Sequence, residues 1–474
     1  MIFGLGSRGT TNLLTRALEC VGKGLESLPD PTQLRYHLPN DVDLRVWKDW
    51  EKYMEELCRR FPGEKRGIRG FYKECWIIFE ALNSMELRSL EEPRYLLDVF
   101  IKHPGRCFDL LKYIARNVGD VARKWIRDEE VLKYVDMECY CWSVAKAMRT
   151  PMINGGMVFC DRHYGGINYP RGGVGKLSEV LVEGIVEGGG MVAYGRRVTG
   201  LILDERGERC VGVKLADGTE LRAPVVVSNC TRWDTFNNLL PRDAVPKSEK
   251  KFQNRYVKSP SFLSMHLGVV ESKLKVDMSS EAEMDVHHIV LEDWENLEVA
   301  NDAHGTIFVS IPTVLDKSLA PDGRHIFHVF TPSWMDEWEN MGIDEYKRKK
   351  EELSNRIIDR LEKIFPGLSE AIELKEVGTP RSHRRFLGRE DGTYGPVPSK
   401  KLNGLITMPF NKTSVEGLYC VGDSCFPGQG LNAVAFSGFA CAHRIEADFG
   451  KVATVPRFID STLSNLLSKK RLEI

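Results

Sequence analysis

The sequence predicts an α+β protein with interleaved lobes, and three observations support this. Residues 1–150 are mostly helical in pattern, being rich in Leu, Trp and paired charges. Residues 240–400 mix strand-like stretches with one long helix. Residues 417–450 give a short apolar strand, a Gly-Asp turn and a helix of small residues. Because no internal repeat or low-complexity linker separates these regions, we expect lobes that share segments of the chain.

Composition excludes several classes of protein. The 474 residues include 66 Lys and Arg against 67 Asp and Glu, so no charge excess indicates a nucleic acid or an acidic partner. No apolar run reaches the roughly 18 residues of a transmembrane helix, and the first residues show no signal or transit pattern. The 12 cysteines include no C-x-x-C pair, and the nearest two are Cys139 and Cys141. We therefore interpret most of them as small core residues in a reducing compartment, and we expect no metal site.

The opening glycines spell the dinucleotide-binding pattern G-x-G-x-x-G, at Gly4, Gly6 and Gly9. A working fingerprint follows a buried strand, and the chain has only three residues before Gly4. Apolar residues from Leu13 to Val21 recur at helical spacing. We therefore predict a glycine-rich helix entry that is capped by Thr10 or Thr11 and binds no nucleotide.

The segment after residue 150 predicts several elements in sequence. A helix with Leu177, Val180, Leu181 and Ile185 on one face precedes a strand, MVAY, at 191–194. Asp217-Gly218 is typical of a hairpin turn between alternating segments. The run from Val225 to Val227 predicts a fully buried parallel strand.

Residues 240–400 predict three strands and a long helix. The strands are SFLSMHLGV, GTIFVSIPT and HIFHVFT. The helix near 344–365 carries an apolar stripe that includes Leu353, Ile357, Leu361 and Ile364. The charge run at 347–352 is therefore expected on a solvated surface.

The segment GLYCVGDSCFPGQGLNAVAFSG, from 417 to 438, has physical properties that suit a flavin. Gly422 would let a cofactor approach the backbone, and Asp423 could accept a hydrogen bond from a ribityl hydroxyl. The helix that begins near Leu431 offers free N–H groups and a partial positive charge, which favour an anionic reduced flavin. An ordinary β–α turn without a ligand fits these residues equally well.

A resemblance to a known family covers nearly the whole chain. The stretches that carry it include LNSMELRSLEEPRYL, TPMINGGMVFCDRHYGGINYPRGGVGKL, SNCTRWDTF, SPSFLSMHLGV, SLAPDGRHI, FPGLSEAIELKEVGTPRSHRRFLGREDGTYGP and GLYCVGDSCFPGQGLNAVAFSG. On these the chain resembles the carotenoid isomerases (prolycopene isomerases) of plastids and cyanobacteria. These belong to the FAD superfamily related to the phytoene desaturases.

The resemblance implies a fold of the FAD-linked reductase type, with interleaved FAD and substrate lobes. We divide the chain accordingly. Residues 1–150 form the helical, membrane-facing part of the substrate lobe, 151–236 an FAD-lobe segment and 237–402 the rest of the substrate lobe; 403–450 form the C-terminal FAD segment and 451–474 a C-terminal helix. Members of the family begin with a βαβ unit that holds the FAD pyrophosphate, and this chain is expected to lack it. We therefore expect weak FAD binding unless that unit is supplied; a fragment, an incomplete gene model and a degenerate paralogue are the alternatives.

The activity that the resemblance implies is FAD-dependent cis–trans isomerisation of poly-cis carotenes, prolycopene to all-trans-lycopene. Reduced flavin would lower the order of a conjugated double bond, with no net redox change. One alternative is a related flavoenzyme that desaturates or saturates a polyene or retinoid. Another is a non-catalytic carotenoid-binding remnant. The location implied is a plastid membrane, or a cyanobacterial membrane.

The cofactor-binding residues carried over from the family are Val198, whose backbone would meet the adenine, and Gly422, Asp423, Gly430, Leu431, Asn432 and Ala433. No catalytic residue is assigned. In CDRHYGGINYP, an acid–base role for Asp161 or His163 is open, although an ion pair that orders a loop is favoured. In TPRSHRRFLG, the side chains of His383, Arg384 and Arg385 either line a substrate entrance or hold a loop.

Residues 94–127 suggest contact with a membrane surface. The segment has eight Lys or Arg against three Asp, together with apolar residues that include Phe100, Ile101 and Phe108. Basic amphipathic helices lie in bilayer interfaces, where an enzyme could collect a carotene that is insoluble in water. A helical pair packed on the core is the alternative.

Overall fold

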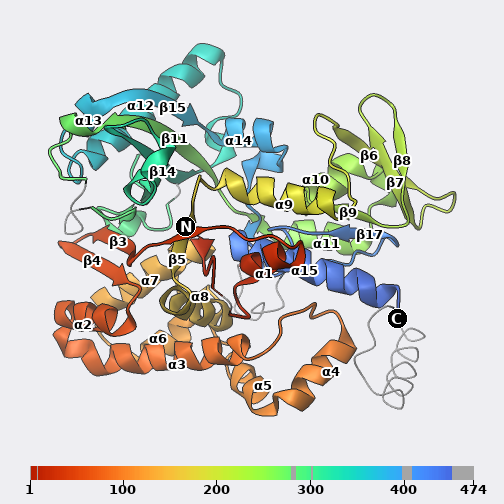
Figure 1. Cartoon of the computed structure of the whole chain (residues 1–474), viewed down its shortest axis with the longest axis horizontal. Coiled ribbons are helices and arrows are strands. Elements are labelled where there is room, and N and C mark those ends of the chain that lie inside the picture. Colours follow the sequence, from red (N-terminus) through yellow and green to blue (C-terminus); the bar gives the residue numbers. More distant parts are fainter. Residues whose placement is uncertain (1, 8, 279–283, 300–302, 398–407, 451–474) are drawn as a thin grey trace.

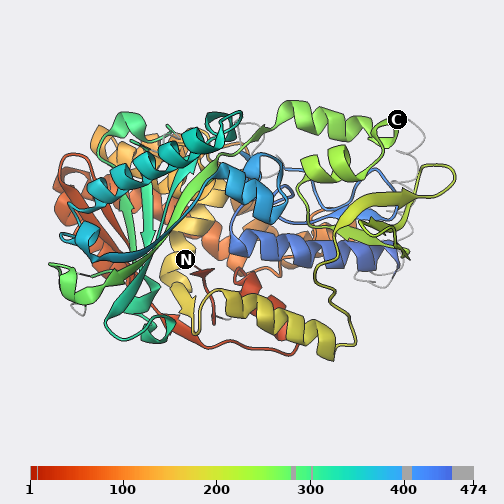
Figure 2. The same cartoon turned by 90° about the horizontal axis from the view of Figure 1, so that it is seen from above.

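The computed structural model describes residues 2–7, 9–278, 284–299, 303–397 and 408–450 (Figure 1). The C-terminal helix expected at 451–474 lies outside the described residues. The chain folds into a large mixed sheet with helices on both sides and, at the other end of the molecule, a smaller group of strands (Figures 1 and 2). No helix among the described residues is both long enough and apolar enough to cross a bilayer.

The large sheet has seven strands in the order β15-β11-β14-β13-β12-β3-β4. Their bounds are β3 Thr32–Leu38, β4 Val42–Trp47, β11 Ser261–Val270, β12 His287–Val290, β13 Ile307–Ser310, β14 Arg324–Ser333 and β15 Ile372–Gly378. Within this sheet, β3 pairs in parallel with β12, and the other described pairs are antiparallel. The three strands predicted between 240 and 400 are thus confirmed, and segments far apart in the sequence share one sheet.

The prediction that residues 1–150 are mostly helical misses β2 (Ser27–Pro29), β3 and β4. Strands β3 and β4 form a local hairpin, whereas β2 pairs with the distant β5 (Ile167–Pro170) and β3 also pairs with the distant β12. Local helical composition could not reveal those partners.

Both faces of the large sheet are covered. Helix α12 (Ile343–Leu361) packs on one face through Leu353, Ile357 and Leu361, while the charge run at 347–352 faces outward for the most part, as predicted. A helical layer packs on the other side of β3 and β4 (Figure 1). It consists of α2 (Trp50–Arg60), α3 (Lys65–Asn83), α6 (Val118–Trp125), α7 (Glu129–Ser143) and α8 (Met152–Tyr164).

The smaller group of strands forms two sheets. Strands β6 (Val198–Leu203), β7 (Cys210–Leu215) and β8 (Glu220–Arg222) are antiparallel, and Gly218 has φ of 88° in the predicted hairpin turn. Strands β9 (Val226–Ser228) and β17 (Leu418–Cys420) pair in parallel. The parallel strand is therefore confirmed, but its full burial is not, because Val227 is 45% exposed.

The prediction of a strand at 191–194 is also wrong. The segment follows α9 (Gly175–Glu187), has no regular structure, and leaves Met191 95% exposed. An apolar β-pattern becomes a strand only when a neighbour supplies backbone hydrogen bonds. None of the described strands lies beside 191–194.

The opening glycines lead from a two-residue strand into a helix, as expected of a helix entry. Strand β1 (Ile2–Phe3) is antiparallel to β5 and is followed by Gly4 with φ of 58°. A Cβ on Gly4 would lie 1.6 Å from Asn12 Oδ1, so the glycine makes room for the buried Asn12 side chain.

Helix α1 (Leu13–Cys20) begins after Asn12, and neither predicted threonine caps it. Thr10 instead hydrogen-bonds to Asn83 at the end of α3, and Thr11 to Asp161 of α8. All twelve cysteines are free and most are buried, in agreement with the expectation of small core residues.

Candidate functional site

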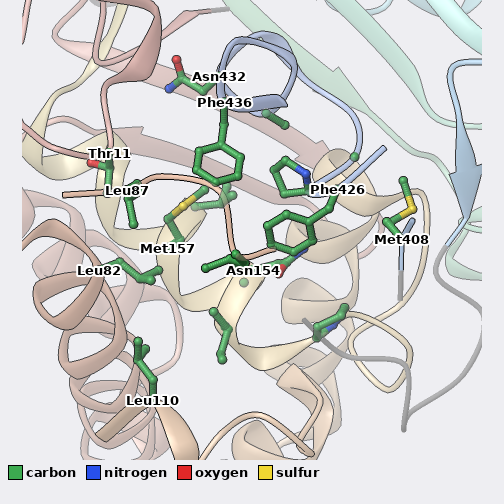
Figure 3. A pocket seen from close by; sticks show the side chains of 18 of the residues that line it. Thr11, Leu82, Leu87, Leu110, Asn154, Met157, Met408, Phe426, Asn432 and Phe436 are labelled. Atoms are coloured by element: carbon green, nitrogen blue, oxygen red, sulfur yellow. The ribbon is translucent and has the colours of Figure 1, made fainter. Parts of the chain in front are cut away.

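An apolar cavity of about 430 Å³ lies between the helical layer and the turn that precedes helix α15 (Leu431–Asp448) (Figure 3). Its wall comes from α3, α4 (Pro93–Lys102), α5 (Pro104–Leu111), α7, α8 and the residues around 408 and 426–436. Figure 3 shows Leu82, Leu87, Leu110, Met157, Phe426 and Phe436 lining it. Such a wall favours an apolar ligand that a few polar groups orient.

The strand–turn–helix unit predicted from the sequence borders this cavity. Gly422 follows β17 with φ of 100°, and a Cβ there would lie 2.7 Å from Asn229 Oδ1. Its N–H donates to Ser437 Oγ of α15 at 3.1 Å. Asn411 also donates to the carbonyls of Cys420 (2.9 Å) and Ser437 (3.1 Å). These bonds hold the helix close against the strand.

The N-terminus of α15 opens beside the cavity. Gly430 is the N-cap residue, with φ of 101° and no side-chain capping bond, and a Cβ there would meet open space. Gln429, Asn432 and Ala433 line the cavity, and Leu431 is 40% exposed. The first turn of an α-helix leaves N–H groups without helical partners and carries a partial positive charge. An apolar cavity and a donor-rich helix end therefore meet at one place.

Asp423 is largely buried and forms an ion pair with Arg389. The Arg389 guanidinium also donates to the Thr393 carbonyl at 2.6 Å, which fixes its position. A ligand hydroxyl at Asp423 would therefore share the carboxylate with Arg389, a partner that the sequence did not indicate.

The predicted cofactor-binding residues fall into two groups. The structure brings Gly422, Asp423 and 430–433 together in one strand–turn–helix unit. Val198 lies elsewhere, at the start of β6, where it pairs with Leu215 and is no part of the cavity wall.

The expected loop ion pair around Asp161 is wrong. Residues 161–164 form the last turn of α8, and Arg162 pairs with Glu138 of α7, both side chains being buried. Asp161 is hydrogen-bonded to Thr11 instead, 3.3 Å away. Burial lowers the pKa of His163 to about 3, so its ring is neutral at physiological pH.

The cluster in α14 (Pro380–Leu387) does not line the cavity. Arg384 pairs with Glu339 at 2.6 Å, and His383 lies 3.0 Å from the Tyr394 hydroxyl. Arg385 lies over the Phe386 ring. Of the two interpretations, the one in which these residues hold local structure fits their contacts.

Helices α4 and α5 form an outer rim of the cavity and are poorly covered. Tyr95 is the one buried residue of α4, and α5 has none. Phe100, Phe108, Ile101 and Leu111 are 43%, 57%, 58% and 54% exposed. Phe100 and Leu111 also line the cavity. Leu110 and the buried Tyr113 and Val118 nevertheless pack on the core, so part of 94–127 fits the alternative of core packing, and the membrane contact stays a prediction.

Most of the cavity wall was not foreseen. Residues 82–90 and 142–159 carried no site prediction, because each contributes ordinary apolar side chains. The one sequence signal was TPMINGGMVFC, in which Gly155 and Gly156 bring α8 against Val118 and Ile78.

Comparison with known proteins gives the relationships of the chain. It is 52% identical to the chloroplastic prolycopene isomerase of Arabidopsis thaliana, over 98% of this chain and 77% of that protein. The chloroplastic prolycopene isomerase of Daucus carota is also 52% identical, over 98% and 74%. Among solved structures, an oxidoreductase from Methanosarcina mazei has a TM-score of 0.55 at 15% identity, over 92% and 85%, which is a likeness of fold alone. No family model matches the chain.

Proposed function

The chain belongs to the prolycopene isomerase family, and from this premise we propose that it converts poly-cis carotenes, prolycopene among them, to the all-trans form. One observation carries the proposal: an apolar cavity of about 430 Å³ adjoins the uncapped N-terminus of α15. The predicted α+β fold of the FAD-linked reductase type is confirmed, and its interleaved segments build the cavity.

FAD is the cofactor that we infer for this site. The fit rests on Gly422, where a side chain would collide with Asn229, on open space at Gly430, and on the N-terminus of α15, which has no side-chain cap. Gly422, Asp423 and 430–433 would hold the flavin end, and the Val198 backbone would meet the adenine. Reduced FAD supplies reversible electron or proton donation to a conjugated double bond, which lowers its bond order with no net redox change.

The residues of the chain have three tasks in this proposal. The cavity wall excludes water and holds the polyene extended. The N–H groups at 431–433 stabilise negative charge beside the cavity. Arg389 fixes the Asp423 carboxylate, so that it can orient a hydroxyl.

We infer weak retention of FAD by this chain alone. Among the described residues, β9 and β17 next to the flavin end form a sheet of two strands, and Val227 of β9 is exposed. The donors of α15 would therefore hold most of the flavin by themselves.

The α4–α5 rim is the inferred contact with a plastid membrane. Its exposed aromatic and aliphatic side chains lie beside three exposed cations, Lys102, Arg106 and Lys112. Each forms a surface ion pair and keeps further N–H donors that could contact lipid headgroups. Phe100 and Leu111 belong both to this rim and to the cavity wall, so a carotene would pass from lipid to cavity without entering water.

The test is an isomer assay with a reducing system and FAD added to the purified chain. Prolycopene in liposomes should convert to all-trans-lycopene, resolved by chromatography, without consumption of donor in proportion to product. Consumption in proportion would instead indicate a polyene saturase or desaturase. Tight carotene binding without conversion, even after the amino-terminal segment of a relative is supplied, would indicate a binding protein.

A further inference from the structure

Helix α8 carries a buried carboxyl group on the same face that lines the cavity. Asn154 and Met157 line the cavity, and Asp161 lies one turn further along that face (Figure 3 shows Asn154 and Met157). Asp161 is 2% exposed. Its carboxylate lies 3.3 Å from the Thr11 hydroxyl, and Thr11 is itself part of the cavity wall.

The charged side chains near Asp161 are engaged elsewhere. On α8, Arg162 pairs with Glu138 of α7. On α3, Glu80 lies 3.6 Å from Arg106. Burial raises the pKa of the neighbouring Cys160 thiol well above its usual value, so this thiol carries no charge.

The nearest polar groups are neutral. Asn83 at the end of α3 has Oδ1 3.5 Å from the Thr11 hydroxyl. Asn12 is buried with both amide atoms unpartnered among the described residues. With no cation opposite it, Asp161 has its pKa raised by burial to about 7, against the lowering effect of the Thr11 hydrogen bond.

A hydroxyl group has one proton to donate, and the state of Asp161 decides where that proton goes. An ionised Asp161 can only accept, so it draws the Thr11 proton toward itself and away from the cavity. A neutral Asp161 can donate to Thr11, which leaves the Thr11 proton available to Asn83 Oδ1, 3.5 Å away, or to a ligand in the cavity.

We propose that Asp161 is a positioning residue that takes up a proton when an apolar polyene enters the cavity and then directs the Thr11 hydroxyl toward the ligand. This inference rests on the proposed function, because it takes a polyene as the occupant of the cavity. No redox step is involved: one proton comes from solvent on binding and returns to solvent on release.

The sign of the pH dependence follows from solvation. An apolar ligand displaces water from the part of the cavity that Thr11 lines, and the Thr11 hydroxyl lies 3.3 Å from the Asp161 carboxylate. The ligand therefore makes the charged form of Asp161 less favourable and binds the neutral form better. Affinity is therefore full below the pKa of free Asp161 and falls as pH rises above about 7, with a limiting slope of about tenfold for each pH unit.

The experiment measures binding of diphenylhexatriene, an uncharged fluorescent polyene, to the full chain from about pH 5.5 to about pH 9. The probe has no titratable group, and the readout needs neither FAD nor catalysis. The wild-type chain should bind about tenfold more weakly for each pH unit above the midpoint. Asp161→Asn should bind as tightly as the wild type does at low pH, with no slope.

A matched control is Asp30→Asn. Burial raises the pKa of Asp30 to about 8, but Asp30 accepts its hydrogen bond from the Thr32 N–H, and Thr32 is no part of the cavity wall, so this variant should keep the wild-type slope. Thr11→Val provides a second variant in case Asp161→Asn does not fold. It removes the bond that favours the ionised carboxylate, so the midpoint should move to higher pH.

Three results would overturn the inference. Binding of the wild-type chain without a slope, or a slope retained in Asp161→Asn, rejects the role of Asp161 while leaving the polyene cavity in place. Failure of every variant to bind the probe at any pH rejects the polyene cavity, and this inference with it.

Discussion

The seven-stranded sheet and the β9–β17 pair contrast in what lies beside them. In the large sheet, Val329 of β14 is 0% exposed, because α12 covers that face and strands flank β14 on both edges. In the pair, Val227 of β9 is 45% exposed although its sequence is just as apolar. An apolar strand pattern therefore indicates that burial would stabilise the segment. Whether the strand is buried depends on which other helices and strands pack against it.

The large sheet also packs against a buried polar network. Tyr36 of β3 hydrogen-bonds to Glu138 of α7, which pairs with Arg162 of α8. Tyr53 joins the Tyr72 and Tyr134 hydroxyls at 2.7 and 2.9 Å. The network ties β3 to the helices that build the cavity wall, so damage to it should affect sheet and cavity together.

The largest effect should follow from breaking that network. Arg162→Met leaves the Glu138 carboxylate buried without its cation, and we expect a loss of about 3 to 5 kcal/mol in the free energy of unfolding. Guanidinium denaturation followed by tryptophan fluorescence measures it. The double variant with Glu138→Gln should recover much of the loss, and a double variant as unstable as the single one would contradict the account.

A matched pair of valines tests the contrast between the two sheets directly. Val329→Ala should cost about 2 kcal/mol, because it removes buried methyl groups from a packed core. Val227→Ala should change stability by no more than about 0.5 kcal/mol. Equal costs, from the same denaturation curves, would mean that β9 is covered in solution.

The same contrast explains how far the sequence could predict the fold. SFLSMHLGV and HIFHVFT have strand partners within the chain, and both predictions hold. The pattern of MVAY at 191–194 is as strand-like, but no described strand lies beside it. Likewise, nothing near β3 in the sequence indicates its pairing with β12, which lies about 250 residues further along the chain.

For the site too, the sequence could indicate local features but not contacts between distant segments. The sequence predicts a site between Gly422 and Ala433 because glycines and a helix start leave a local signature. The Asp423–Arg389 pair, the Asp161–Thr11 bond and the cavity wall join distant segments through ordinary side chains. Each such contact depends on the tertiary fold, so no short motif could reveal it.

A smaller effect is expected at the turn next to the strand pair. Gly422→Ala would place a methyl group 2.7 Å from Asn229 Oδ1 at φ of 100°, and should cost about 2 kcal/mol while reducing flavin retention. Gly438→Ala is the control, because it lies within α15 in open space and should be neutral or slightly stabilising. Flavin absorbance after desalting measures retention, and unchanged retention in Gly422→Ala would place the flavin elsewhere.

The smallest effect on stability should come from the α4–α5 rim, whose exposed apolar residues we infer to contact lipid. Phe108→Asp should change the free energy of unfolding by no more than about 0.5 kcal/mol, because the ring is 57% exposed. It should nevertheless weaken binding to phosphatidylglycerol–phosphatidylcholine vesicles by about tenfold or more, since an aromatic ring no longer enters the interface. Met191→Asp alters a side chain that is even more exposed, at 95%, but lies outside the α4–α5 rim, in the segment after α9. Vesicle flotation measures the bound fraction of each variant. If both substitutions reduce that fraction equally, exposure alone accounts for lipid binding, and the rim has no special part in collecting substrate. A response to Phe108→Asp alone separates the two kinds of exposed apolar surface.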